Sequence, residues 1–358
     1  MTTDTSKSIT VLYFGFYDPA FTTNKVLING LRQNGVSVLE CCDHSPGLKK
    51  FLKLFFKHWK LRNKYDAMII GFAGQLAVPF AKIVTRKPII FSGQVSLYDA
   101  NVLDRQVVEA GSLKSLYYWL LDWLAVRLAD RVIMATQSNI DHFSEKLGVK
   151  KEKYRLIFNG AEDDIFRPLE SAKTEKDFLV SFHGTFIPLH GVEFIAKAAK
   201  ILEFEGVQFL IIGRGQEKKK ILDISQQLRM KNIKFIDFMP KNELVFKLAG
   251  SDACLGTFGG NARAQREIAH KIYECLAIRK PLITADTPAI RELFNENEVM
   301  MVKAADPESL AGGILKLKND PILRTRLAQN GYDKFMRSAS CEVLGGEFKK
   351  IIEELIRK

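Results

Sequence analysis

Short apolar runs alternate with helical periods along the first half of the chain, and this alternation restricts the fold more than any other feature. The expected strands cover 9–15, 36–41, 67–72, 88–92, 131–136 and 154–160. Helical periods lie between most of them, at 24–34, 48–63, 113–129 and 138–147. Strands that alternate with helices predict a parallel sheet with helices on both faces.

The pattern stops at a polar stretch, 161–176, which we interpret as a linker, and then begins again. The second set of expected strands covers 178–184, 207–213, 233–238, 253–258 and 281–285, and the helices 191–204, 216–230, 241–249, 267–277, 287–295, 307–319, 321–337 and 341–357. A chain of 358 residues fits two such domains. The sequence predicts an α/β fold of two doubly wound, Rossmann-like domains, 1–165 and 166–340, that face each other across a cleft. The helix at about 341–358 is expected to pack back on the first domain.

The net charge of +12 indicates an anionic partner, which could be nucleic acid, an anionic membrane or a phosphorylated substrate. Nucleic acid is the weakest of these, because the basic residues concentrate in one helix and no recognition motif accompanies them. No apolar run approaches the roughly 18 residues that span a bilayer, and residues 1–8 lack the features of a signal peptide. We therefore expect a cytoplasmic protein. The cysteines have no metal-ligand or redox spacing; they are Cys41, Cys42, Cys254, Cys275 and Cys341.

Four loops of the second domain each follow an expected strand and contain glycine or a helix start. They are His183-Gly184-Thr185, Gly213-Arg214-Gly215, Gly256 to Asn261, and Asp286-Thr287-Pro288. Glycine lets backbone N–H groups approach a phosphate, and the following helix N-termini add positive dipole ends. Glycine can also simply end a strand, but four such loops at one edge favour a diphosphate site.

Lys271 and Glu274 lie three residues apart in the helix expected at 267–277 and therefore share one face. A surface ion pair is the simplest interpretation. Because the helix follows the glycine-rich loop, we instead expect both side chains to face the edge of the sheet where the loops meet.

The sequence resembles the family-4 retaining glycosyltransferases of GT-B fold across nearly the whole chain. The matching stretches are Gly184 to Gly191, Val207 to Gly215, Tyr273 to Ile283 and Asp286 to Glu292. The resemblance implies transfer of a sugar from a nucleotide-sugar donor with retention at the anomeric carbon. The nucleotide sugar is then a co-substrate, and no separate cofactor is expected.

In this family two glutamates stand at the positions of Arg266 and Glu274, and the second holds the donor ribose. The family's Arg and Lys of the glycine-rich turn are replaced here by Thr185 and His190. We therefore expect Arg266 and Lys271 to meet the charge of the leaving diphosphate. No Asp-x-Asp pair follows a strand to hold a metal ion, so we expect metal-independent transfer. The predicted donor site comprises Gly15, Gly184, Thr185, His190, Gly213, Arg266, Lys271, Glu274 and Thr287, and the predicted catalytic residues are Asp99, Arg266 and Lys271.

The first domain is expected to bind the acceptor. Its loops Gly15 to Pro19 and Ser92 to Asp99 follow expected strands. Asp99 and Asp104 are the nearest polar candidates to orient an acceptor or sugar hydroxyl. Either aspartate could equally be a turn residue that caps its own backbone.

The stretch from Leu48 to Lys64 contains no acidic residue. As a helix it places one set of side chains, Leu48, Phe51, Leu52, Phe55, Phe56 and Trp59, opposite another, Lys49, Lys50, Lys53, Lys57, Lys60 and Lys64. Such a helix can lie on an anionic membrane or bury its aromatic face on the sheet, and periodicity does not separate the two. Membrane contact is slightly favoured.

The sequence therefore predicts a nucleotide-sugar-dependent glycosyltransferase with a sugar acceptor that is lipid-linked or close to a membrane. Two alternatives remain open. One is a nucleotide-sugar epimerase on the same architecture, and the other is a non-catalytic nucleotide-sugar-binding protein, suggested by Thr185, His190 and Arg266.

Overall fold

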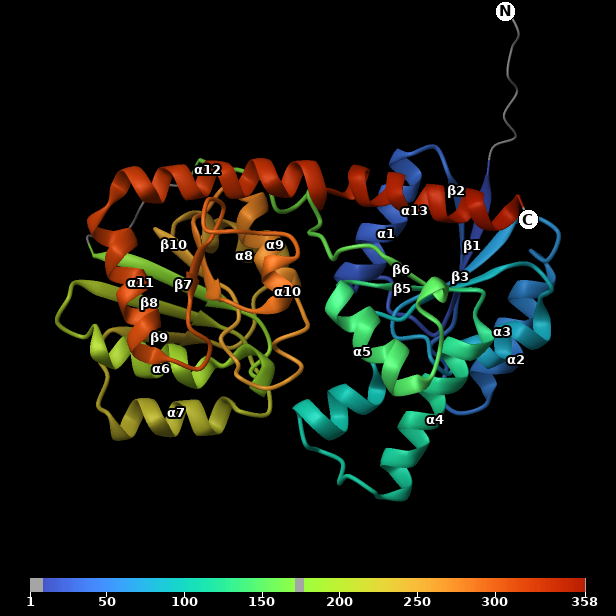
Figure 1. Ribbon diagram of the computed structural model, residues 1–358, viewed down its shortest axis with the longest axis horizontal. Helices are drawn as coiled ribbons and strands as arrows, with labels where there is room; N and C mark the ends of the chain where they lie inside the picture. The colour runs from blue at the N-terminus through green and yellow to red at the C-terminus, as the bar shows by residue number, and fades with distance from the viewer. Residues whose placement is uncertain (1–8, 171–176, 358) are drawn as a thin grey trace, which may run out of the picture. The chain divides into compact units, whose positions relative to one another are not determined.

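The chain divides into two compact units in the computed structural model, which describes residues 9–170 and 177–357. The first unit is Met1–Phe158 together with Ser340–Lys358, and the second is Asn159–Ala339. Part of the expected linker, 171–176, and the residues considered for a signal peptide, 1–8, lie outside the described residues. Each unit is built around a six-stranded parallel sheet (Figure 1).

The first unit has the strand order β2-β1-β3-β4-β5-β6. Its elements are β1 (Thr10–Gly15), α1 (Thr22–Gln33), β2 (Ser37–Cys42), α2 (Lys49–Trp59), β3 (Ala67–Ile70), α3 (Ala77–Val84), β4 (Ile89–Ser92), the π-helical turn η1 (Asp99–Asp104), α4 (Leu113–Leu128), β5 (Arg131–Met134), α5 (Gln137–Leu147), the 3₁₀ turn η2 (Lys151–Lys153), β6 (Tyr154–Leu156) and α13 (Cys341–Ile356). The central strands β3 and β4 are buried at every position, as expected for a parallel sheet covered on both faces.

Helices α2, α3, α4 and α5 pack on one face of this sheet, and α1 and α13 pack on the other. The last two lie side by side (Figure 1). A Cβ atom on Gly30 of α1 would lie 2.2 Å from the carbonyl oxygen of Cys341, so only glycine allows this approach. Asn34 Nδ2 also donates to the carbonyl of Glu342 at 2.8 Å. These contacts make α13 part of the first unit.

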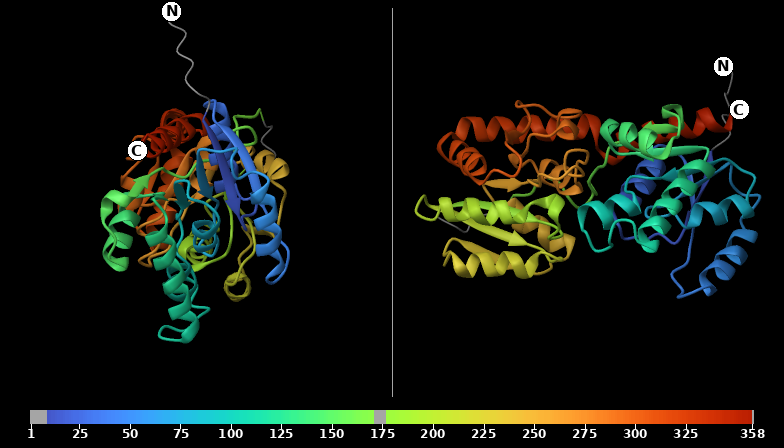
Figure 2. Two further views of the ribbon diagram at one scale, coloured as in Figure 1. Left: turned by 90° about the vertical axis from the view of Figure 1, so that its right-hand side faces the viewer. Right: turned by 60° about the horizontal axis from the view of Figure 1, so that its bottom comes forward.

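The second unit has the strand order β12-β11-β10-β7-β8-β9. Its elements are β7 (Phe178–His183), the 3₁₀ turn η3 (Pro188–His190), α6 (Val192–Ile201), β8 (Val207–Ile212), α7 (Lys218–Gln227), β9 (Ile233–Ile236), α8 (Lys241–Ala249), β10 (Ala253–Leu255), α9 (His270–Ala277), β11 (Leu282–Ala285), α10 (Pro288–Arg291), β12 (Met300–Val302), α11 (Pro307–Asn319) and α12 (Pro321–Ser338). Helices α6, α7 and α11 share one hydrophobic cluster with the strands, and Figures 1 and 2 show α8 and α9 on the opposite side of the sheet from α6 and α7.

Several elements differ from the sequence-based expectation. Helix α3 and strand β12 were not predicted, and the helix expected at 287–295 ends at Arg291. Helix α9 begins at His270 rather than at 267, because Ala269 is extended (ψ 148°) and cannot continue a helix backwards. Within the described ranges, no helix combines the length and apolar character needed to cross a membrane.

Candidate functional site

The glycine-rich turns after β7 and β8 touch each other at the carboxyl edge of the second sheet. Gly184 and Gly213 both have positive φ, at 137° and 152°. A Cβ atom on Gly213 would lie 1.9 Å from the carbonyl oxygen of Gly184. Both positions therefore require glycine for their conformation, and Gly213 requires it for space as well.

The loop after β10 packs against the turn that follows β7, through Phe258 and Gly259. A Cβ atom on Gly191, which follows η3, would lie 2.6 Å from the backbone nitrogen of Gly259, and the amide of Phe258 donates to the carbonyl of His190 at 3.1 Å. The loop after β11 ends at Thr287, whose hydroxyl accepts from the amide of Ile290 at 3.2 Å and caps α10. In this structure the Thr287 side chain is a helix cap.

Lys271 reaches from α9 to the Gly184 turn. Its side chain is buried, with 4% exposed, and its Nζ lies 4.2 Å from the ring centroid of Phe182. A Cβ atom on Gly184 would lie 2.7 Å from this Nζ. The ammonium group has no hydrogen-bond partner among the residues that the structure describes. Burial holds the pKa of Lys271 well below its ordinary value, although the nearby Glu274 acts to raise it.

Glu274 lies one turn further along α9 and is paired with a residue of β7. Its Oε2 is 2.7 Å from Nε2 of His183, and both side chains are buried. Burial by itself would raise the pKa of Glu274, but the hydrogen bond and charge of His183 outweigh it, and the pKa lies below its ordinary value. Glu274 is thus held as a carboxylate with one oxygen engaged. The other ring nitrogen of His183, Nδ1, is buried and has no partner among the described residues.

Thr185 and His190 occupy the positions where the related family has Arg and Lys. Thr185 is exposed, whereas His190 is buried and its Nδ1 contacts the carbonyl of Thr185. Burial, and then the charge of Lys271, lower the pKa of His190 well below its ordinary value. His190 is therefore neutral near pH 7 and supplies no positive charge.

Arg266 lies in the loop before α9, which begins only at His270. The loop is closed by Asn261, whose Oδ1 accepts from the amide of Ala264 at 2.8 Å. Arg266 donates from Nη1 to the carbonyl of Ala262 at 3.0 Å, so part of its guanidinium is folded onto its own loop. The neighbouring Glu267 accepts from Nε of Arg263 at 2.7 Å. Arg263 is a buried cation that the sequence analysis did not single out.

The first unit presents its own loops at the carboxyl edge of its sheet. Gly15 ends β1 with φ 136°, and Asp99 begins η1 after β4. Asp99 is buried, and its Oδ2 lies 3.2 Å from Nε2 of His142. The same loop is held by Asp122 of α4, which accepts from the Ser96 hydroxyl at 2.7 Å. Burial raises the pKa of Asp122 to about 6.

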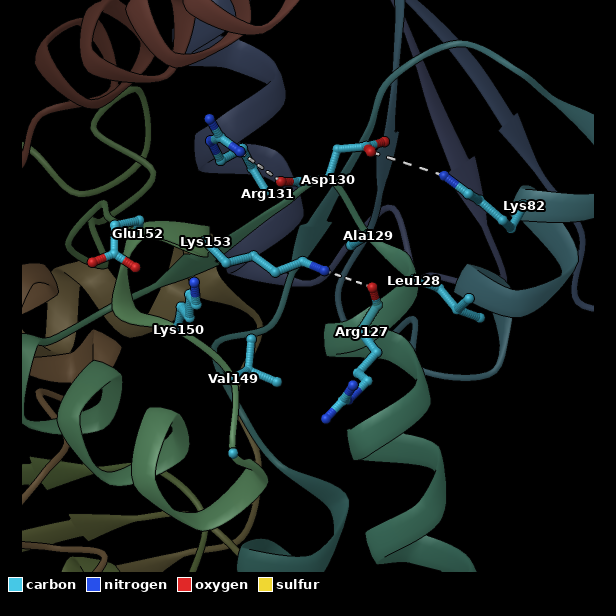
Figure 3. A pocket seen from close by; sticks show the side chains of 11 residues that line it. Lys82, Arg127, Leu128, Ala129, Asp130, Arg131, Val149, Lys150, Glu152 and Lys153 are labelled. Atoms are coloured by element: carbon cyan, nitrogen blue, oxygen red, sulfur yellow. Dashed lines mark hydrogen bonds and ion pairs between the residues drawn. The ribbon is translucent and has the colours of Figure 1, made fainter.

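A hollow of about 720 Å³ lies at the opposite, amino edge of the first sheet (Figure 3). Five cations line it with two acids: Lys82, Arg127, Arg131, Lys150 and Lys153 with Asp130 and Glu152. Lys153 donates to the carbonyl of Arg127, near the end of α4, at 2.5 Å. Helices α3, α4 and α5 all end here, and cations stabilise the negative ends of helix dipoles. This accounts for the charge of the hollow without a ligand.

The family is decided by the second unit. Residues 163–334, which include the Gly184 turn, Lys271 and Glu274, match the family described as Glycosyl transferases group 1. The second unit of the chain belongs to this family. This confirms the family expected from the sequence.

The similar proteins described next are distant in sequence. The alpha-D-kanosaminyltransferase of Streptomyces kanamyceticus is 24% identical over 243 residues, which are 63% of this chain and 62% of that protein. A sucrose-phosphate synthase from Thermosynechococcus elongatus has a TM-score of 0.77 at 15% identity, over 98% of this chain and all of that one (100%). Anabaena Alr3699/HepE in complex with UDP-glucose has a TM-score of 0.72 at 16% identity, over 97% and 100% of the two chains. These likenesses confirm the GT-B fold.

In this group 1 glycosyl transferase, the residues brought together around the Gly184 turn are Gly213, His190, Lys271 and Glu274, with His183 in addition. The position of His183, directly before the glycine that ends β7, was visible in the sequence, but nothing there indicated its bond to Glu274. Arg266 and Thr287 lie in neighbouring loops, and Gly15 and Asp99 belong to the other unit.

Proposed function

We propose that this protein transfers a sugar from a nucleotide-sugar donor, bound around Lys271 and Glu274, to an acceptor at an anionic membrane surface. The observation that carries the donor site is the buried Lys271 ammonium, which lies against the Gly184 turn without a hydrogen-bond partner among the described residues. A buried amino group without a hydrogen-bond partner costs free energy, and an anion that binds beside it removes this cost and holds the amino group charged. A nucleoside diphosphate supplies such an anion.

Glu274 is proposed to hold the donor ribose. His183 occupies one of its carboxylate oxygens at 2.7 Å, and an ionised carboxylate can accept further hydrogen bonds, here from ribose hydroxyls. His183 is then a positioning residue, since it fixes the carboxylate and keeps it ionised. The two side chains project from different elements, β7 and α9, so the pair also fixes their relative positions.

The reaction breaks the bond between the anomeric carbon and the diphosphate oxygen, and negative charge grows on the departing diphosphate. A fixed cation beside that oxygen stabilises the transition state more than the ground state. We assign this role to Lys271 and, from the neighbouring loop, to Arg266. Transfer with retention and without a metal ion is part of the same proposal, as is orientation of the acceptor by Asp99.

A thermal-shift panel of nucleoside diphosphates and their sugars tests the donor site. UDP and UDP-glucose come first, because HepE was solved with UDP-glucose. A ligand at 100 times its dissociation constant should stabilise the protein by about 2.7 kcal/mol. Lys271→Ala should lose this shift, and Lys234→Ala, a change at an exposed lysine of β9, should retain it. Equal shifts in both variants would remove Lys271 from the site.

The same assay, extended to turnover, separates the alternatives. Conversion of the donor sugar without any acceptor would indicate an epimerase. Binding without turnover across a wide acceptor panel would indicate a non-catalytic protein. Turnover only with an acceptor supports transfer.

Helix α2 is the reason to place the acceptor at a membrane. Its buried side chains are Leu54 and His58, whereas the sequence analysis assigned Leu54 to neither face. Most of the aromatic face is not packed on the sheet: Leu48, Leu52, Phe55, Phe56 and Trp59 are 80%, 64%, 36%, 63% and 56% exposed. An exposed apolar stripe beside lysines is the arrangement of a helix that lies in the membrane interface. A cytoplasmic location at the inner membrane face stays a prediction.

Vesicle co-sedimentation tests this contact. Lys49→Gln/Lys60→Gln should weaken binding to anionic vesicles about 30-fold, because each lysine near the surface contributes about 1 kcal/mol. The pair Lys219→Gln/Lys234→Gln changes the net charge equally on exposed positions of the second unit and should have little effect. Equal binding to neutral and anionic vesicles would contradict the electrostatic account.

A further inference from the structure

The first half of α4 carries a second apolar stripe that is not covered by any part of the described chain. Leu113, Leu116, Tyr117 and Leu120 are 88%, 58%, 49% and 42% exposed. Their spacing places all four on one face of the helix. By contrast, Leu121, Ala125 and Val126 in the second half of α4 are buried. The helix therefore packs on the sheet with its carboxyl half and presents apolar side chains with its amino half.

Figures 1 and 2 show this amino half of α4 extending beyond the neighbouring elements of its unit. The segment that leads into it adds two exposed apolar side chains, Leu103 and Val107, which are 40% and 59% exposed. Single exposed leucines are ordinary, but a continuous exposed apolar surface on one protruding helix indicates an interaction site.

The apolar stripe of α4 lies on the same face of the sheet as α2 and at the same edge as the Asp99 loop. Helices α2 and α4 both connect parallel strands on the same face of the sheet, so both run antiparallel to the strands and begin at the carboxyl edge. The loop that contains Asp99 lies at this edge, directly before α4. Helix α3 packs between α2 and α4, and its Ile83 is 82% exposed. One helical layer therefore exposes apolar side chains from three neighbouring helices.

The charges around this layer indicate what covers it. Lysines border the apolar side chains of α2 and α4, at Lys49, Lys53 and Lys114. The core of a protein interface is depleted of lysine, whereas an interfacial membrane helix combines lysine with aromatic and aliphatic side chains. The occupant that fits this chemistry is an anionic lipid bilayer.

We propose that the amino half of α4 inserts into the lipid interface as a second membrane element, next to the acceptor loop. This inference rests on the proposed membrane contact of α2 and deepens it, because two parallel helices fix how the first unit sits on the bilayer. The helical layer of α2, α3 and α4 then faces lipid, and its end at the carboxyl edge lies next to the Asp99 loop. An acceptor with its hydrocarbon in the bilayer and its polar group at the interface would meet the Asp99 loop.

Single-tryptophan proteins can test each helix separately. The chain has three tryptophans, Trp59 of α2 and Trp119 and Trp123 of α4. Trp119 packs against the core and stacks on Trp123, so it does not report on the exposed stripe. Trp59→Phe/Trp119→Phe/Trp123→Phe/Tyr117→Trp places a reporter within the stripe, and Trp119→Phe/Trp123→Phe leaves Trp59 on α2. Vesicles of phosphatidylglycerol and phosphatidylcholine that carry brominated acyl chains should quench both reporters.

Quenching of Trp59 without quenching of the Tyr117→Trp reporter would overturn this inference and leave the α2 contact intact. Quenching of the Tyr117→Trp reporter alone would support the inference and contradict the α2 contact. Quenching of neither would contradict both. The assay does not depend on sugar transfer, so it separates these failures from a failure of the donor site.

A second measurement uses proteins that keep their natural tryptophans, so that its result does not depend on the tryptophan substitutions. Leu113→Ser/Leu116→Ser should reduce vesicle binding about tenfold or more, since two exposed leucines lose their transfer to lipid. The control Ile201→Ser/Phe204→Ser removes apolar side chains that are 48% and 94% exposed in the second unit, and should have no effect. If the α4 variant instead changes the oligomeric state in sedimentation velocity and leaves vesicle binding unchanged, the stripe is a contact between copies of the chain, and the lipid proposal is wrong.

Discussion

Replacement of Lys271 by Met should remove a proton-linked component of nucleotide binding. In the free protein, burial lowers the pKa of Lys271, and no hydrogen-bond partner among the described residues holds its charge. A bound diphosphate places negative charge beside Nζ and raises that pKa again. Nucleotide binding should therefore take up a proton wherever the free amine is neutral and the bound amine is charged.

The sign and size of the effect follow from linkage. The affinity for the nucleotide is highest below the pKa that Lys271 has in the free protein. It falls as the pH rises from there toward the pKa that Lys271 has in the complex. One pKa unit corresponds to about 1.36 kcal/mol, so affinity should fall by up to tenfold per pH unit within this window. The Lys271→Met protein has no ionisable group at this position and should bind more weakly, without this slope.

Isothermal titration in two buffers of different ionisation enthalpy measures the proton number directly. The titration of UDP should be done above about pH 7.5, where the phosphate's own ionisation, with a pKa of about 6, is complete. We expect uptake of up to one proton for the natural protein and none for Lys271→Met. Absence of uptake in the natural protein across this range, or the same uptake in the variant, would refute the reasoning.

Three further predictions concern other residues. Glu274→Gln replaces a charged hydrogen-bond acceptor by a neutral one and should weaken nucleoside diphosphate binding by about 1.5–3 kcal/mol, with the melting temperature little changed. Calorimetry measures this affinity, and an unchanged value would remove Glu274 from the site. Arg266→Ala should lower turnover by about 10²-fold, and turnover of the natural protein should persist in EDTA; loss on chelation and return with magnesium would place the charge elsewhere. Asp122 has a pKa of about 6 in the folded protein and about 4 in the unfolded chain. Between these values the folded protein binds more protons than the unfolded chain, so the free energy of unfolding should fall as the pH rises from 4 to 6. Urea unfolding of Asp122→Asn should lack this fall.

The sequence was sufficient for the fold because both halves repeat an unambiguous pattern of buried strands and helices. Helix α3 was missed because its run, AVPFAKIV, is apolar almost throughout and contains a proline. The start of α9 was placed too early, since the turn closed by Asn261 is rich in alanine and charged residues and has the composition of a helix.

For the proposed donor site, the sequence indicated which loops come together and that Lys271 and Glu274 lie on the side of the helix toward them. It did not indicate the pairing of Glu274 with His183. That pair joins β7 to α9, and such a distant contact leaves no local signal. The neutral state of His190 follows from its burial and from Lys271, neither of which a motif reveals. On α2, periodicity divided apolar from basic side chains correctly in outline, but it could not show that Leu54 and His58, rather than the aromatic stripe, face the core.

The contact between α13 and α1 has a consequence for the order of folding during synthesis. Helix α1 emerges from the ribosome early, but its partner α13 follows only after the whole second unit, Asn159–Ala339, has been made. At about 5–20 residues per second, about 180 residues take roughly 10–40 s. Throughout that interval the surface around Gly30 and Leu27 is without its partner helix, whereas the second unit has all of its strands before α13 is made. The unit that is synthesised first is therefore the one that can be completed last.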